Sequence, residues 1–229
     1  MLLVYDKILM QILLYMDGEE MNIAIFGATG RVGYLICALA LQDRHTVAAL
    51  ARTPDKLKPL ADSNASLRIV KGNAIQADAV QETLQGADAV ISALSTDGGT
   101  VLSDSLPLML DAMHQQGIKR LVAIGTAGVL NSRTEPGLLR YQSSESKRSL
   151  TRAAEEHHAV LRILESSELD WTLVCPTYLP DGPAEGRYRA EHSYLPENGT
   201  RITTGDTAAF AYAQLFSKQY SRARAGIAY

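Results

Sequence analysis

The stretch Ile23-Ala-Ile-Phe-Gly27-Ala-Thr-Gly30-Arg-Val-Gly33 joins a short apolar run to three regularly spaced glycines. An apolar strand that passes through such a turn into a helix is the context that a dinucleotide-binding turn requires. Gly27 permits the tight turn, Gly30 lets the backbone approach a pyrophosphate, and Gly33 lets the helix pack closely on the strand. The start of the helix then offers free N–H groups to the phosphates. We expect the other contacts of this turn to come from Thr29, Arg31 and Val32.

The rest of the chain supplies the alternation of strands and helices that this turn needs. From residue 21 onward, apolar runs alternate with stretches of helical periodicity, which is typical of parallel strands joined by crossover helices. The expected strands are Ile23–Phe26, Thr46–Ala51, Leu67–Lys71, Ala89–Ala93, Arg120–Gly125 and Trp171–Cys175. The expected helices are Gly30–Leu41, Pro54–Ala61, Asp104–Gln116, Ser146–Ser167 and Thr207–Ser217, with Asp206 as the N-cap of the last. The sequence therefore predicts an α/β fold with a doubly wound parallel sheet, the Rossmann fold.

No linker divides the chain, so we expect residues 21–229 to form a single domain. Prolines and glycines become frequent after Pro176, and short strands are expected at 187–189 and 201–203. We expect residues 176–229 to form a small C-terminal cap over the carboxyl edge of the sheet, where open α/β folds bind ligands. Residues 1–20 are expected to be an N-terminal extension before a native start at Met21, with a packed or interfacial helix as the alternative.

Composition excludes several classes of function. Hydrophobic residues make up 46% and charged residues 21% of the 229 residues, which is typical of a folded globular protein. The formal net charge of -3 gives no basic field for nucleic acid, and no apolar run is long enough to span a membrane. Cys37 and Cys175 lie in apolar runs without metal-ligand spacing. We expect a cytoplasmic protein without a metal, as a monomer or small homo-oligomer.

Cofactor choice is expected at the end of the second strand. A carboxylate there would bind the ribose hydroxyls of NAD, whereas a guanidinium accommodates the extra phosphate of NADP. This chain has Arg52, with Lys56 and Arg31 as further cations, or else as solvated surface charges. The sequence therefore predicts NADP(H) in preference to NAD(H). The loops after the third and fourth strands are expected to line the cofactor through Gly72, Asn73, Ala74, Leu94 and Ser95.

Several motifs together resemble the atypical short-chain dehydrogenase/reductase superfamily. They are the glycine-rich turn, Ala49-Leu-Ala-Arg-Thr53, Lys71-Gly-Asn-Ala74 and Val122-Ala-Ile-Gly-Thr126. The later runs from His157 to Pro176 and from Leu179 to Tyr188 resemble the branch of biliverdin-IXβ/flavin reductases and NmrA-like proteins. The resemblance implies an NADPH-dependent reductase of flavins, tetrapyrroles or quinones, with Thr126 near the nicotinamide. Tyr178 stands where tetrapyrrole-reducing relatives carry a histidine, which disfavours a tetrapyrrole.

The candidate chemistry is hydride transfer with little proton help. The superfamily's Tyr-x-x-x-Lys pair is absent, because Tyr141 and Lys147 are too widely spaced for one helix face. A flavin or quinone needs only to be placed on the nicotinamide with water excluded. We expect Thr126 and Tyr178 to place this small-molecule acceptor, with Tyr188 beside them. His157 is a candidate for a core histidine, for a hydrogen bond to the Thr126 loop, or for a catalytic acid.

The sequence leaves two functions open. The first is an NADPH-dependent oxidoreductase that passes hydride to a flavin-like or quinone-like acceptor. The alternative is a non-catalytic NADP(H)-binding redox sensor of the NmrA-like type. A sugar-nucleotide epimerase would need a larger substrate domain than the chain after Pro176 supplies.

Overall fold

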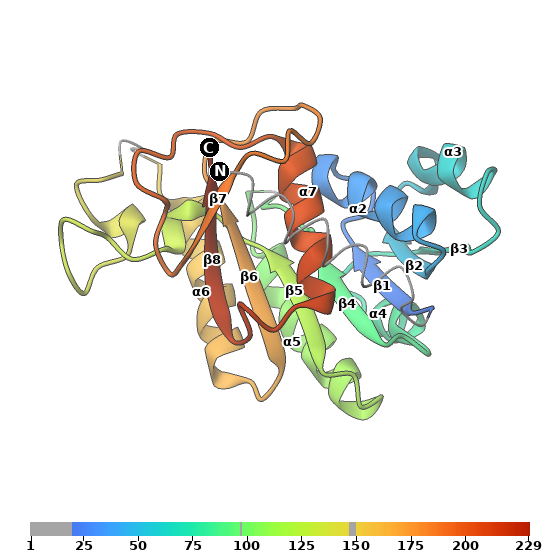
Figure 1. The fold of residues 1–229 in the computed structure, drawn as a ribbon. Helices are drawn as coiled ribbons and strands as arrows, with labels where there is room; N and C mark the ends of the chain where they lie inside the picture. Colours follow the sequence, from blue (N-terminus) through green and yellow to red (C-terminus); the bar gives the residue numbers. More distant parts are fainter. Residues whose placement is uncertain (1–19, 97, 147–149) are drawn as a thin grey trace.

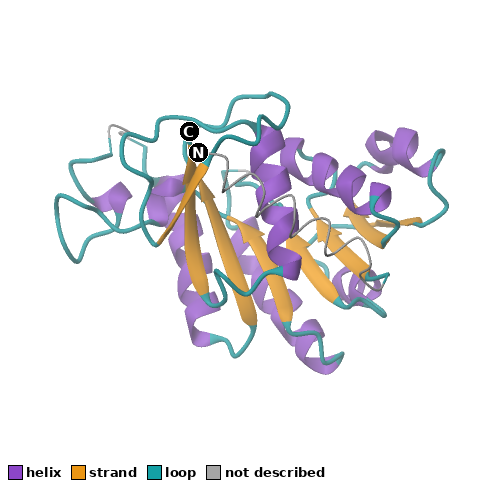
Figure 2. Ribbon diagram, in the orientation of Figure 1, coloured by secondary structure: helices purple, strands orange, loops and turns teal. Residues whose placement is uncertain are grey.

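A parallel sheet runs through the whole molecule and positions the site. The structure is a computed structural model that describes residues 20–96, 98–146 and 150–229. In these residues eight strands form one sheet in the order β3-β2-β1-β4-β5-β6-β8-β7 (Figure 2). The strands are β1 (Asn22–Phe26), β2 (Thr46–Ala51), β3 (Leu67–Lys71), β4 (Ala89–Ser92), β5 (Arg120–Ile124), β6 (Asp170–Pro176), β7 (Arg189–His192) and β8 (Ala223–Ala228). All neighbours are parallel except β7 and β8.

Strand β1 lies inside the sheet, where its residues 23–26 are buried and it pairs with both β2 and β4. Ala24 lies beside Ala48 on one side and Val90 on the other. The chain winds outward from β1 in one direction to β3 and then returns to continue outward through β4, β5 and β6. Such a reversal of strand order leaves a crevice at the carboxyl ends of β1 and β4, where doubly wound folds bind dinucleotides. The expected doubly wound Rossmann fold is confirmed.

Helices cover both faces of the sheet (Figure 1). One face is covered by α2 (Arg31–Gln42) and α7 (Thr204–Ala213), which pack on each other, and the other by α4 (Ala77–Leu84), α5 (Val101–Gln115) and α6 (Arg152–Ser166). The short helices are η1 (Pro54–Leu57), α3 (Lys58–Ala61), η2 (Ala127–Val129), η3 (Arg140–Gln142) and η4 (Gln214–Phe216). Fully buried Ile36 and Met113 mark the two apolar cores, one on each face.

The expected cap is smaller than residues 176–229. Strand β8 pairs with β6 inside the sheet, and α7 packs on α2 in a helix layer. Both elements therefore complete the Rossmann core, which leaves residues 177–203 as the cap segment, with β7 within it added to the sheet as an antiparallel edge strand. Strand β8 was missed because Ala223-Arg-Ala-Gly-Ile-Ala228 is made of small residues and a charge rather than an apolar run. The expected strand at 201–203 is reduced to an isolated bridge between Tyr178 and Arg201.

Several helix boundaries differ from expectation. The last helix begins at Thr204 after the N-cap Thr203, whose side chain accepts a hydrogen bond from the Asp206 backbone N–H. Asp206 is therefore not the N-cap. Helix α6 begins at Arg152, so Leu150 is outside its apolar stripe and is 86% exposed. Helix α4 was not expected. The extension at residues 1–19 and Lys147 lie outside the described residues.

Candidate functional site: a dinucleotide-binding edge

The glycine-rich turn is built by close contact between backbones. Gly27 has a φ of +78°, and a Cβ there would lie 2.5 Å from the carbonyl carbon and oxygen of Ala93 at the end of β4. A Cβ on Gly33 would lie 2.2 Å from the carbonyl oxygen of Gly27. A side chain on Gly27 would push the turn away from the end of β4, and a side chain on Gly33 would push α2 away from the turn that follows β1, so both positions require glycine. The expected roles of Gly27 in the turn and Gly33 in helix packing fit this geometry.

The beginning of α2 is left open for an anion. Its N-cap is Gly30, which supplies no side-chain cap, and its first turn contains no acidic residue. The N–H groups of residues 31–33 have no partners within the helix, as in the first turn of any α-helix. Free donors and the positive end of the helix dipole then face the crevice at the carboxyl edge. The turn therefore fits the diphosphate of a dinucleotide.

The three candidate cations have different environments. Arg52 directly follows β2, Lys56 lies in η1, and both are exposed. Across the described part of the chain, neither side chain forms an ion pair, whereas neighbouring Lys58 pairs with Asp55 at 2.9 Å. Arg31 instead contacts the cap segment, where it pairs with Asp181. The structure thus leaves Arg52 and Lys56 available to a phosphate and gives the Arg31 guanidinium another partner.

The loops after β3 and β4 border the same crevice. The Gly72 N–H donates to the carbonyl oxygen of Ala51 at 3.2 Å, which holds this loop against the end of β2. The Asn73 side chain accepts a hydrogen bond from the backbone N–H two residues later, at 3.4 Å, and so forms a turn. Ala74 is buried beneath it. After β4, Leu94 is half-buried and Ser95 is exposed, so only Ser95 fully faces solvent at this point.

Thr126 follows β5 and is half-buried. It is the N-cap of η2, and its hydroxyl accepts a hydrogen bond from the Gly128 N–H at 3.4 Å. This contact fixes the short helix but leaves the hydroxyl proton to be donated elsewhere. Nearby Cys175 is fully buried, and burial raises the pKa of its thiol to about 12, so it is not a thiolate nucleophile at neutral pH.

The two cap tyrosines are placed differently. Tyr178 is 63% exposed, and its backbone oxygen accepts from the Ile202 N–H at 2.9 Å, which fixes the start of the cap segment. The ring of Tyr188 packs edge-on against Phe210 of α7, with the centroids 5.6 Å apart. Burial also raises the pKa of Tyr188 to about 12. Tyr188 is half-buried, and its place beside the acceptor stays a prediction.

The two adjacent histidines of α6 lie in different environments, because consecutive residues of a helix point in different directions. His157 is buried, burial lowers its pKa to about 4, and its Nδ1 has no hydrogen-bond partner among the described residues. This is a neutral core histidine. His158 is half-buried, and its Nδ1 lies 2.9 Å from the Tyr141 hydroxyl. This Tyr141–His158 contact was not expected, and no local sequence spacing reveals it.

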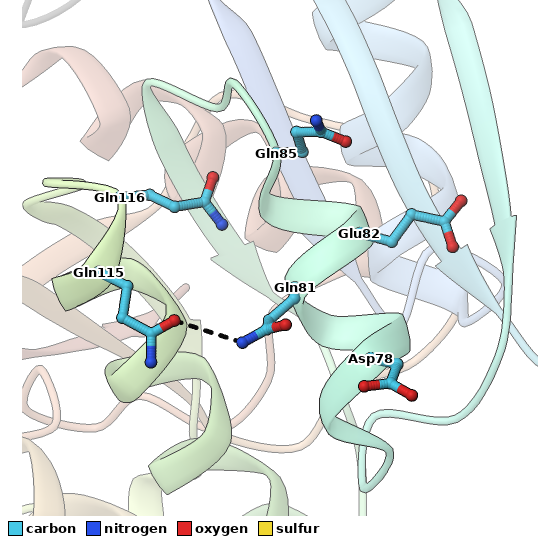
Figure 3. Close-up of a pocket in the computed structure, with 6 residues that line it drawn as sticks. All are labelled: Asp78, Gln81, Glu82, Gln85, Gln115 and Gln116. Carbon is cyan, nitrogen blue, oxygen red and sulfur yellow. Dashed lines mark hydrogen bonds between the residues drawn. The ribbon is translucent and has the colours of Figure 1, made fainter.

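A hollow of about 410 Å³ lies elsewhere, between α4 and α5 (Figure 3). Its lining is polar and consists of Asp78, Gln81, Glu82, Gln85, Gln115 and Gln116. Gln81 donates a hydrogen bond to Gln115 across it at 3.3 Å. It runs along the length of α4 and borders the C-terminal end of α5 rather than the carboxyl edge of the strands, so it is separate from the glycine-rich turn. The described residues contain no helix able to cross a membrane and no cluster suited to a metal.

Comparisons with known proteins agree with this geometry. A candidate epimerase from Bacteroides thetaiotaomicron is 28% identical, with a TM-score of 0.80 over 92% of this chain and 98% of that one. A candidate NADH-flavin reductase from Streptococcus pneumoniae (TM-score 0.76, covering 91% and 99%) and an anaerobilin reductase from Escherichia coli O157:H7 (TM-score 0.75, covering 90% and 96%) are both 22% identical. At that identity they show the shared fold.

The family model described as NAD(P)H-binding matches residues 27–218. The match begins at the first glycine of the turn and ends two residues after η4. This match agrees with the resemblance drawn from the sequence motifs and identifies a nicotinamide dinucleotide as the cofactor. The chain belongs to the NAD(P)H-binding family.

Proposed function

We propose that the chain is an NADPH-dependent oxidoreductase that passes hydride to a flavin-like or quinone-like acceptor. The observation that carries the proposal is Tyr178, a large aromatic side chain that is 63% exposed at the carboxyl end of β6. The next residue, Leu179, is hydrogen-bonded to Arg31 of the glycine-rich turn. An exposed aromatic ring beside a dinucleotide-binding turn is suited to stacking a planar acceptor.

Arg52 and Lys56 supply the preference for NADPH. Both are exposed beside the end of β2, and within the described residues neither is neutralised by a carboxylate. Charge-assisted hydrogen bonds to a phosphate are stronger than neutral ones, and a guanidinium binds phosphate oxygens in a bidentate manner. This pair would thus hold the phosphate on the adenosine ribose, while the N–H groups at the start of α2 would hold the diphosphate.

When bound, the nicotinamide would supply a hydride, and with it two electrons, to the acceptor. One proton from water completes the reduction, so NADPH, acceptor and a proton give NADP⁺ and the reduced acceptor. The chain's own residues orient the reactants. The Thr126 hydroxyl donates a hydrogen bond to the carboxamide or to the acceptor. Tyr178 covers the acceptor and excludes water. The solved relatives named as reductases support this class of reaction for the fold.

The direct test is steady-state oxidation of NADPH with FMN, riboflavin and a short-chain quinone as separate acceptors. We expect oxidation that depends on both acceptor and protein, and faster turnover with NADPH than with NADH. The Arg52→Glu variant should keep the NADH rate and lose the NADPH rate. Tight binding of NADPH without its oxidation in the presence of any of these acceptors would overturn the proposal that the chain is an enzyme and would support the redox-sensor alternative. A cytoplasmic location and the monomeric or small oligomeric state remain predictions.

A further inference from the structure

One contact joins the glycine-rich turn to the cap segment. The Nη1 atom of Arg31 donates to the carbonyl oxygen of Leu179 at 3.0 Å and to Oδ1 of Asp181 at 2.8 Å. Arg31 is the first residue of α2, and its partners are about 150 positions away in the sequence. A single guanidinium therefore holds two points of the loop formed by residues 178–182, which we call the acceptor loop.

The acceptor loop is fixed on its other side by backbone bonds to the segment that begins α7. Thr204 donates its N–H to Pro180 at 3.1 Å, and Gly205 donates to Gly182 at 3.0 Å. A Cβ at Gly205 would lie 2.3 Å from the Ala184 nitrogen, so this side is tightly packed. The loop thus has a rigid attachment to α7 and a polar attachment to the dinucleotide-binding turn.

We propose that Arg31 and Asp181 act as positioning residues: their ion pair holds the acceptor loop against the dinucleotide-binding turn and so places Tyr178 for the acceptor. The inference rests on the proposed function and deepens it. Arg31 starts at the same helix end whose N–H groups face the diphosphate, and Tyr178 directly precedes a residue that Arg31 binds. The pair therefore connects the two halves of the predicted site, and phosphate recognition is left to Arg52 and Lys56.

The strength of the connection follows from its exposure. The Arg31 side chain is 57% exposed and that of Asp181 is 74% exposed, so water and salt screen the pair. Exposed pairs of this kind shift an equilibrium by about two- to fivefold. An effect of this size on acceptor binding is measurable, and it should shrink as salt is added.

The test compares Asp181→Asn with Glu185→Gln. Both remove one carboxylate from the cap segment, but Glu185 has Arg187 rather than Arg31 as its cationic neighbour, at 4.0 Å. We expect Asp181→Asn to raise the acceptor KM about two- to fivefold, with kcat and the NADPH dissociation constant unchanged, and Glu185→Gln to change none of them. Asp181→Glu should restore most of the acceptor affinity. Adding Asp181→Asn to Arg31→Gln should cause little further change.

A second readout does not depend on turnover. Hydrogen exchange of a peptide covering residues 178–182 should be faster in Asp181→Asn than in the unsubstituted protein, and unchanged in Glu185→Gln. Unchanged exchange in Asp181→Asn would overturn the attachment itself. If Asp181→Asn turns over with an unchanged acceptor KM, only the role of the ion pair in placing Tyr178 is overturned. Absence of turnover in the unsubstituted protein would overturn the proposed function and the acceptor role together, while the exchange result still reports on the attachment.

Discussion

Substituting alanine at two glycines of the turn should separate packing from ligand binding. In Gly33→Ala the new methyl group would lie 2.2 Å from the Gly27 oxygen and 2.9 Å from the Gly27 carbonyl carbon. These are backbone atoms that cannot rotate away, so α2 must retreat from β1 by about 1 Å to restore normal contact. Val32, Ile36 and Cys37 of α2 pack in the core beside β1 and would retreat with it.

The expected loss of stability in Gly33→Ala is about 1–3 kcal/mol, the range for overpacking a close contact. Gly30→Ala is the matched control. Its methyl group would lie 3.2 Å from the Gly27 oxygen, and the backbone of Gly30 has an ordinary φ of -81°. Its stability should therefore change by less than about 1 kcal/mol, partly because alanine restricts the unfolded chain. Gly30→Ala should nevertheless lose NADPH affinity, because the methyl group blocks the approach of the diphosphate.

The assay is urea unfolding followed by circular dichroism, together with a fluorescence titration of NADPH. We expect Gly33→Ala to unfold at lower urea and Gly30→Ala to unfold near the unsubstituted protein while binding NADPH at least about tenfold more weakly. If the free energy of unfolding of Gly33→Ala lies within about 0.5 kcal/mol of that of the unsubstituted protein, the close contact is refuted. Unchanged NADPH affinity in Gly30→Ala would refute the assignment of this turn to the diphosphate.

Three further predictions concern separate residues. Arg52→Glu should weaken NADPH binding by about 2 kcal/mol, roughly 30-fold, and leave NADH binding unchanged, whereas Arg44→Glu at the opposite end of β2 should alter neither dissociation constant. Tyr178→Ala should raise the acceptor KM about two- to tenfold and Tyr178→Phe should not, because stacking needs the ring and not the hydroxyl. The pKa of His157 is lowered from 6.5 to about 4 by burial, so the unfolded chain binds a proton that the folded chain does not. The contribution of His157 to the free energy of unfolding should be complete above about pH 6.5 and should fall by up to about 3 kcal/mol as the pH drops towards 4. In His157→Leu the free energy of unfolding should depend less steeply on pH over this range.

Much of the fold was predictable because the sheet is buried on both faces. Parallel strands covered by helices consist of nearly continuous apolar residues, and the expected ends of the six strands from β1 to β6 all lie within one residue of the observed ends. Strand β8 carries no such signal, since its burial is imposed by neighbours. A Cβ on its Gly226 would lie 2.0 Å from the Tyr194 oxygen, which shows how closely the cap segment crosses it.

Local signals could have corrected some of the remaining errors. Thr203-Thr-Gly-Asp206 has the spacing of a helix start in which the first residue caps the third helical N–H, and this is how Thr203 acts. In α4, the buried Val80 and Leu84 have helical spacing, so that helix was also detectable. The contacts of Arg31 with Asp181 and of Tyr141 with His158 join distant parts of the chain. No spacing rule reaches such pairs, and they set the detail of the candidate site.

The central claim is that the turn from Gly27 to Gly33 and the cation at Arg52 form a site for NADP(H). Calorimetric titration of the unsubstituted protein with NADPH and with NADH, at one ionic strength, tests it most directly. We expect saturable binding of one dinucleotide per chain, with NADPH at least about tenfold tighter than NADH, because charge-assisted bonds to the extra phosphate exceed about 1.4 kcal/mol. Equal dissociation constants for the two dinucleotides, or tighter binding of NADH, would contradict it.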